Sequence, residues 1–119
     1  ARRPEQAREL ALDLDASAGE WPPAAGSWDL LVNCTPLGGA GKRDESPLPR
    51  EALTGPLVYD LTYGAGPSAL LRDAKAAGAL TIDGLPMLVA QAERQFEWWT
   101  GQRPEAGVMQ DAVRRKMRS

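Results

Sequence analysis

The sequence of 119 residues contains no histidine and only one cysteine, Cys34. Without histidine, the commonest general base and every histidine-based metal site are excluded, and one cysteine allows neither an internal disulfide nor a cysteine-rich zinc site. A single free cysteine is typical of a reducing compartment, so we expect a cytoplasmic protein. No apolar run is long enough to span a bilayer, and the first residues are not those of a signal peptide. We therefore expect no membrane partner.

The sequence also lacks an excess of charge of either sign. Its 14 basic and 16 acidic residues give a net charge of −2, so no global field attracts nucleic acid or an anionic membrane. A basic run at residues 114–118 fits the usual complement to a helix C-terminus, and we expect no nucleic-acid partner. With 43% hydrophobic residues, the chain can form one small domain with a modest core.

The apolar segments alternate in a way that predicts an α/β domain with a parallel sheet. Short apolar runs predict strands at residues 29–33, 57–61 and 79–82, the first of them typical of a strand covered on both faces. Right-handed crossovers between these strands give a three-layer α/β/α arrangement. Three strands leave two open edges and bury little area, so we expect a missing N-terminal half or a partner chain to cover an open edge.

Apolar periodicity and Pro or Gly boundaries predict the helices. Their expected ranges are residues 4–15, 67–77, 86–100 and 105–117, with one further helical turn within residues 48–53. The side chains expected to pack are Ala7, Leu10, Ala11 and Leu14; Leu70, Ala74 and Ala77; Phe96, Trp98 and Trp99; and Val108, Met109, Ala112 and Val113. Residues 38–49 are rich in glycine and charge, which predicts a mobile surface loop.

Because the three strands are parallel, their carboxyl ends converge on one crevice, where open α/β sheets bind ligands. These ends are residues 33–35, 61–63 and 83–84. The helix that begins near Pro86 places Met87 and Gln91 on one face, and the Gln91 amide can donate to and accept from a polyhydroxylated ligand. From this segment alone, the position of Gln91 at the water boundary of an ordinary amphipathic helix is the favoured interpretation.

Three other side chains near the strand ends allow two interpretations each. Tyr63 has a hydroxyl that suits a ligand, or it is a half-buried packing residue. Asp60 and Asp83 can take part in chemistry or cap a turn. No nucleophile–base pair, paired-carboxylate site or phosphate-binding G-x-G-x-x-G pattern is present, because the glycines of residues 38–41 lack that spacing.

Arg2 and Arg3 precede the first helix, where a strand closing a βαβ unit would have ended. In dinucleotide-binding folds this place carries an acid for the ribose hydroxyl of NAD or arginine for the 2′-phosphate of NADP. No acid occurs before Glu5, which favours NADP. The alternative is that the two arginines are exposed and have no role.

Three ordered motifs resemble those of the shikimate dehydrogenase family. They are Asn-Cys-Thr-Pro-Leu-Gly at residues 33–38, Tyr-Asp-Leu-Thr-Tyr at 59–63 and Asp-Gly-Leu-Pro-Met-Leu-Val-Ala-Gln-Ala at 83–92. Residues 2–7 also look like the family's Asn-Arg-Thr-type segment. The resemblance covers essentially the whole chain but about the C-terminal half of a family member. It implies that residues 1–119 are the C-terminal part of a Rossmann-like NADP-binding domain, including C-terminal helices at about 86–118, with the N-terminal substrate domain and first βαβ unit absent.

The resemblance implies reversible, NADP-dependent reduction of 3-dehydroshikimate to shikimate, a step of aromatic amino-acid biosynthesis. It assigns cofactor binding to Arg2, Arg3, Asn33, Thr35, Leu61, Gly84 and Met87, and substrate binding to Tyr63 and Gln91. The family's catalytic Lys and Asp and its phosphate loop match nothing here. No catalytic residue is therefore assigned, and we expect the 119-residue chain alone to be inactive.

Three departures from the family pattern affect the predicted site. Ala1 stands where the family usually has Asn, Arg3 replaces a hydroxyl residue, and Pro86 replaces a common Gly. Two other functions remain open. One is a related NAD(P) oxidoreductase acting on quinate or another small hydroxy acid, and the other is a non-catalytic half-domain that binds a nucleotide or a partner chain.

Overall fold

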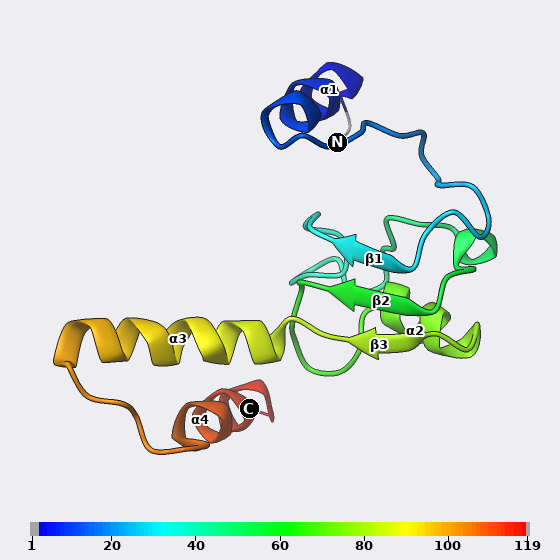
Figure 1. Ribbon diagram of the computed structural model, residues 1–119. Coiled ribbons are helices and arrows are strands. Elements are labelled where there is room, and N and C mark those ends of the chain that lie inside the picture. The colour runs from blue at the N-terminus through cyan, green and yellow to red at the C-terminus, as the bar shows by residue number, and fades with distance from the viewer. Residues whose placement is uncertain (1–2, 119) are drawn as a thin grey trace.

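The three predicted strands pair into one parallel sheet, β1 (Leu30–Asn33), β2 (Leu57–Asp60) and β3 (Leu80–Ile82). The computed structural model describes residues 3–118. The spatial order is β1-β2-β3, and the three arrows in Figure 1 point the same way, so their carboxyl ends share one edge. The predicted α/β class and parallel sheet are confirmed.

The helices begin and end at the residues that local chemistry favours. They are α1 (Pro4–Asp13), the short 3-10 helix η1 (Arg50–Ala52), α2 (Ala69–Ala76), α3 (Leu85–Thr100) and α4 (Val108–Arg118). Proline occupies the first turn of α1 and of α3, where its missing N–H costs nothing. Gly101 ends α3 with a φ of 69°, a left-handed conformation that glycine adopts without strain. No helix among residues 3–118 has the length and apolar character needed to cross a bilayer.

The core lies between one face of the sheet and α2. Its buried members are Leu31, Leu48, Leu53, Val58, Leu70, Leu71 and Ala74. Leu31 and Val58 are neighbours on β1 and β2, and Leu70 of α2 is fully buried. Leu48 is only 2% exposed, so the segment predicted to be a mobile surface loop contributes a core side chain. Ala77, predicted to pack, is exposed at the end of α2.

The opposite face of the sheet carries two apolar rows that are open to solvent. In strand order, the rows are Leu30, Leu57 and Leu80, and Val32, Tyr59 and Ile82. Leu30 is 50% exposed and Leu80 73% exposed. The prediction that the first strand is covered on both faces is therefore wrong for the described residues, since α2 and η1 cover only the other face. We name these two rows the apolar sheet face.

The remaining helices lie outside the sheet, as Figure 1 shows. Helix α1 contacts no other described helix or strand, and Leu10 on its predicted buried stripe is 58% exposed. Helices α3 and α4 pack against each other, yet Trp98 and Trp99 are 80% and 79% exposed and Val108 is 50% exposed. The predicted packing of Leu10, Trp98, Trp99 and Val108 is wrong, because at least half of each side chain is exposed to solvent.

Candidate functional site

Asn33 ends β1, Asp60 ends β2 and Asp83 directly follows β3, and the side chain of each caps the following turn. Asn33 Oδ1 accepts the Thr35 backbone N–H at 2.9 Å, and Asp60 Oδ1 accepts the Thr62 N–H at 3.0 Å. Asp83 Oδ1 accepts the N–H of the residue two further on, also at 3.0 Å. These Asx turns redirect the chain at the shared carboxyl edge. Asp60 and Asp83 therefore have the capping role that the sequence left open.

A buried polar network joins two of these turns to the start of α2. Asp60 is fully buried, and its carboxylate accepts the Asn33 Nδ2–H at 3.0 Å and the Ser68 Oγ–H at 2.5 Å. Ser68, also fully buried, caps α2 by accepting the Leu71 N–H at 3.3 Å. The buried carboxylate is tolerated because it accepts hydrogen bonds from Asn33, Thr62 and Ser68. The network therefore fixes the ends of β1 and β2 relative to α2.

Gly84 brings the third strand end against the second. Its N–H donates to the Thr62 carbonyl at 3.0 Å, and a Cβ built on Gly84 would overlap the Leu61 carbonyl oxygen. The φ of −77° is ordinary, so close approach of two backbones, and not an unusual dihedral, requires glycine here. The structure therefore places Leu61 and Gly84, two predicted cofactor residues, in contact at the beginning of α3.

The other predicted site residues differ in their exposure. Thr35 and Gln91 are exposed, Tyr63 is 44% exposed, and Leu61 and Met87 are half-buried. Thr35, Leu61, Tyr63 and Gly84 lie at the carboxyl edge or directly beyond it, while Met87 and Gln91 follow on α3. This edge presents hydroxyl groups and the first turn of a helix.

Three predicted residues are placed differently from the rest. Asn33 lies at the edge but is only 3% exposed, so its side chain is turned into the protein. Arg3 is exposed and directly precedes α1, which stands apart from the sheet in Figure 1. Arg2 lies outside the described residues.

Arg43 anchors the segment that follows the first turn, and sequence reasoning missed it. Its guanidinium donates to the Gly38 carbonyl at 2.6 Å and to the Gly66 carbonyl, and its own carbonyl accepts the Ala69 N–H at 2.9 Å. These contacts join the loops after β1 and β2. No local pattern marks Arg43 for this role, because the Gly66 and Ala69 partners are far away in the sequence.

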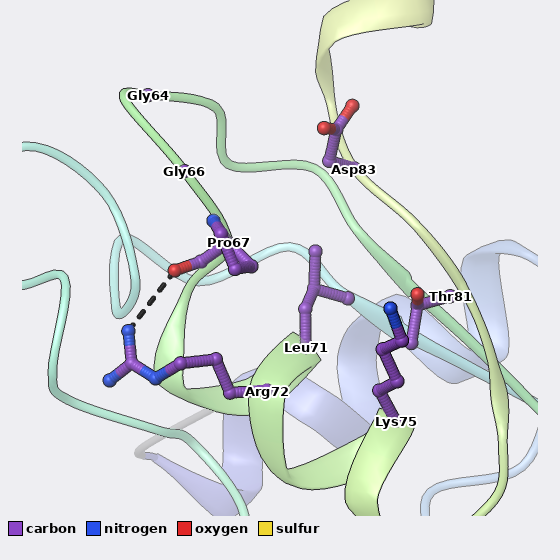
Figure 2. A pocket seen from close by; sticks show the side chains of 8 residues that line it. All are labelled: Gly64, Gly66, Pro67, Leu71, Arg72, Lys75, Thr81 and Asp83. Carbon is purple, nitrogen blue, oxygen red and sulfur yellow. Dashed lines mark hydrogen bonds between the residues drawn. The ribbon is translucent and has the colours of Figure 1, made fainter.

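A cavity of about 440 Å³ opens beside the carboxyl edge, between α2, β3 and the loop before α2 (Figure 2). Its lining includes Lys75, Thr81 and Asp83, together with Arg72, which pairs with Asp44 at 2.6 Å. Charges of both signs line it, and it contains no nucleophile–base pair. Among residues 3–118, no cluster of three or more acidic, histidine or cysteine side chains could bind a metal ion.

The three strands are parallel, their carboxyl ends meet at one edge lined by turns, and α2 packs on one face of the sheet. This arrangement defines a Rossmann-like α/β domain. Comparison with known proteins gives the same class. The chain superposes on shikimate 5-dehydrogenase from Thermus thermophilus, solved in complex with NADP(H) and shikimate, with a TM-score of 0.83 and 37% identity over 96% of this chain and 43% of that one.

The sequence comparisons specify the family. A family model described as the shikimate 5′-dehydrogenase C-terminal domain matches residues 84–114. Shikimate dehydrogenase (NADP(+)) of Archaeoglobus fulgidus is 38% identical over 99% of this chain and 47% of its own length. The chain belongs to the shikimate dehydrogenase family. It spans less than half the length of these relatives.

The same fold also occurs in a reductase that is named for a different substrate. The ligand-free 5-ketofructose reductase of Gluconobacter sp. strain CHM43 superposes with a TM-score of 0.74 and 28% identity, covering 97% of this chain and 45% of that chain.

Proposed function

We propose that this chain is the NADP-binding C-terminal part of an NADP-dependent shikimate dehydrogenase, an oxidoreductase that interconverts 3-dehydroshikimate and shikimate. The observation that carries the proposal is the meeting of Leu61 and Gly84 at the beginning of α3, where the family-model match also begins. The names of the relatives support the cofactor and the substrate. In this proposal a substrate domain and the first βαβ unit belong to polypeptide outside the 119 residues.

The described residues fit the uncharged half of a dinucleotide. The carboxyl edge offers the Thr35 and Tyr63 hydroxyls and the half-buried apolar side chains of Leu61 and Met87. Such a set suits ribose hydroxyls and a flat nicotinamide ring, which is neutral in NADPH, since both take hydrogen bonds and apolar contact. Bound NADPH would supply the hydride. Thr35, Leu61, Gly84 and Met87 would orient it.

The remaining assignments follow the same scheme. Tyr63 and Gln91 are exposed and would bind hydroxyl or carboxylate groups of shikimate. Arg2 would contact the 2′-phosphate of the cofactor, with Arg3 as a neighbouring positive charge. The substrate and cofactor would place the protein in the cytoplasm, in aromatic amino-acid biosynthesis.

Substitution of Arg2 tests the cofactor assignment. Arg2→Ala should weaken NADP binding by roughly tenfold to 150-fold, because a charge-assisted bond to phosphate contributes roughly 1.5–3 kcal/mol, and should leave NAD binding nearly unchanged. Isothermal titration with both nucleotides measures this selectivity. Arg8→Ala, on the exposed surface of α1, is the matched control. Equal losses for NADP and NAD would contradict recognition of the 2′-phosphate.

Activity of the isolated chain tests the domain assignment. We expect a chain whose mass confirms its 119 residues to bind NADPH. We do not expect it to oxidise shikimate, because the described residues contain no acid–base pair at the strand ends. Turnover at the rate of a complete enzyme would disprove that assignment. Absence of any nucleotide binding would favour a non-catalytic half-domain that packs against a partner chain.

A related oxidoreductase acting on another polyhydroxylated compound is the second candidate. The likeness to 5-ketofructose reductase favours it, since that protein shares the fold. Tyr63 and Gln91 also suit several polyols. Side-by-side kinetics with shikimate and quinate, using a protein that contains this chain together with a substrate domain, would distinguish the two candidates. A higher kcat/KM for quinate would favour the second.

A further inference from the structure

The Asn33 side chain uses its complete hydrogen-bonding capacity inside the protein. Its Nδ2 donates to the Leu37 carbonyl at 2.9 Å and to Asp60 Oδ1 at 3.0 Å. Its Oδ1 accepts from the Thr35 backbone N–H at 2.9 Å and lies 2.7 Å from Thr35 Oγ1. An amide has two donor hydrogens and two acceptor lone pairs, so nothing remains for a ligand.

These partners also determine the direction of the Thr35 hydroxyl. The Leu37 carbonyl can only accept, and Asp60 Oδ1 already accepts the Thr62 N–H, so the Asn33 nitrogen must face both of them. The amide oxygen then faces Thr35, and its hydroxyl proton must point to that oxygen. The Leu37 N–H donates to Thr35 Oγ1 at 3.3 Å, which leaves one lone pair of this exposed hydroxyl for a ligand.

The arrangement is supported from the core. Asp60 is fully buried and accepts from Asn33, Thr62 and Ser68, which connects the Thr35 turn to β2 and to the first turn of α2. Turning the Thr35 hydroxyl away would cost Asn33 Oδ1 one of its two hydrogen bonds. The Asn33 amide cannot flip to compensate, because a flipped amide would set its oxygen against the Leu37 carbonyl and Asp60. Such buried unsatisfied contacts are costly, so the hydroxyl keeps one orientation.

We propose that Asn33 and Asp60 are positioning residues that hold the Thr35 hydroxyl as a hydrogen-bond acceptor, and that Thr35 thereby recognises a neutral donor group of the cofactor. This inference rests on the proposed function, in which Thr35 lines the NADP site. The donor belongs to the uncharged nicotinamide riboside end, as a ribose hydroxyl or the carboxamide N–H. A phosphate oxygen has no proton to donate at this position, and two acceptors repel each other. Asn33 therefore acts through Thr35 and does not touch the cofactor.

The test compares two nucleotides on Thr35→Val, which keeps the shape of the side chain and removes the hydroxyl. NADPH binding, followed by its fluorescence, should weaken roughly threefold to tenfold, the range for one neutral hydrogen bond. Binding of 2′,5′-ADP, which lacks the nicotinamide end, should be unchanged. Thr35→Ser should bind like the wild type. Thr54→Val, which removes an exposed hydroxyl that accepts the Gly26 N–H at 3.1 Å, is the matched control.

An equal loss for both nucleotides, or no loss for NADPH, would overturn the inference. The 3-acetylpyridine analogue of NADP distinguishes the two possible donors, because it lacks the carboxamide N–H. If Thr35→Val still weakens this analogue, the donor is a ribose hydroxyl; if the effect disappears, the donor is the carboxamide.

Variants of Asn33 and Asp60 test the positioning role of these two residues. Asn33→Ala should weaken NADPH and spare 2′,5′-ADP, a selectivity that general damage to the fold would not produce. Asp60→Asn should bind NADPH better than Asp60→Ala, because an amide oxygen can still accept from Asn33 and Thr62 while its nitrogen donates to Ser68. Equal binding by the two Asp60 variants would overturn the role of this residue.

Hydrogen exchange separates this inference from the proposed function. The Thr35 amide should be protected in the wild type and lose protection in Asn33→Ala, whether or not nucleotide is present. If the wild type binds neither nucleotide, the proposed function fails, and so does recognition of a cofactor by Thr35. Unchanged protection in Asn33→Ala would overturn the positioning role even if NADPH binds.

Discussion

At the scale of one residue, Gly84 is the position where the smallest change has the clearest expected consequence. Gly84→Ala would force a methyl group into the Leu61 carbonyl oxygen, so the beginning of α3 must move away from the end of β2. We expect a loss of about 1–3 kcal/mol in the free energy of unfolding, as for other overpacked sites. Urea denaturation measures it, and Gly19→Ala, with open space around its Cβ, should change stability by less than about 0.5 kcal/mol. If Gly84→Ala is as stable as Gly19→Ala, the beginning of α3 can move away from the end of β2 without a cost in stability.

At the scale of elements, a three-residue ion cluster joins α3 to the segment before α4. The Glu97 carboxylate accepts from Arg103 Nε at 3.3 Å and from Arg94 Nη1 at 3.0 Å. The hydrogen bond from Arg103, and then the one from Arg94, lower the pKa of Glu97 below its usual value. A folded-state pKa below the unfolded value stabilises the fold at neutral pH, and this contribution disappears as the pH falls through the folded-state pKa.

Glu97→Gln should therefore cause a small decrease in melting temperature at pH 7, since exposed ion pairs contribute little. The decrease should shrink at acid pH, where the wild-type carboxylate also loses its charge. Circular dichroism melts at neutral and acid pH measure the difference. Glu93→Gln, one turn earlier on α3, is the matched control because the structure gives Glu93 no ion pair among the described residues. A difference between wild type and Glu97→Gln that grows toward acid would contradict the assigned direction.

The order and type of these elements could be predicted because they depend on local chemistry. Apolar runs located all three strands, and Pro86 and Gly101 mark the two ends of α3 through their own backbone preferences. Packing was predicted less well. Trp98 and Trp99 are predicted to pack near the end of the helix but are exposed, because burial requires a partner surface that the local sequence cannot reveal.

In the candidate site, too, some features could be predicted from the sequence and others could not. The convergence of Thr35, Leu61 and Gly84 follows from parallel strands and could be predicted. The saturation of Asn33 and the anchoring by Arg43 could not, because they depend on hydrogen bonds to partners that only the folded chain brings near. We therefore propose that Asn33 supports the neighbouring Thr35, although the family resemblance implies that Asn33 contacts the cofactor.

At the scale of the whole molecule, the apolar sheet face is an exposed apolar surface that none of the described helices covers. Val32 and Ile82, which flank Tyr59 in one row, are 43% and 41% exposed. Contiguous apolar patches of this kind promote association. We expect the 119-residue chain to self-associate through this face at micromolar concentrations. The association should disappear when the chain is joined to a further polypeptide that covers the face. The relatives are long enough to include such a polypeptide.

The double substitution Val32→Thr with Ile82→Thr should shift the isolated chain toward monomer in sedimentation velocity experiments. Threonine keeps the β-branched shape, so the free energy of unfolding should fall by less than about 1 kcal/mol. Val58→Thr is the matched control: this residue is fully buried on the other face, and a hydroxyl there should cost about 1–3 kcal/mol without reducing self-association of the folded chain. A wild-type chain that sediments as a monomer would mean that the open face is too small, or too curved by strand twist, to pair with a second copy.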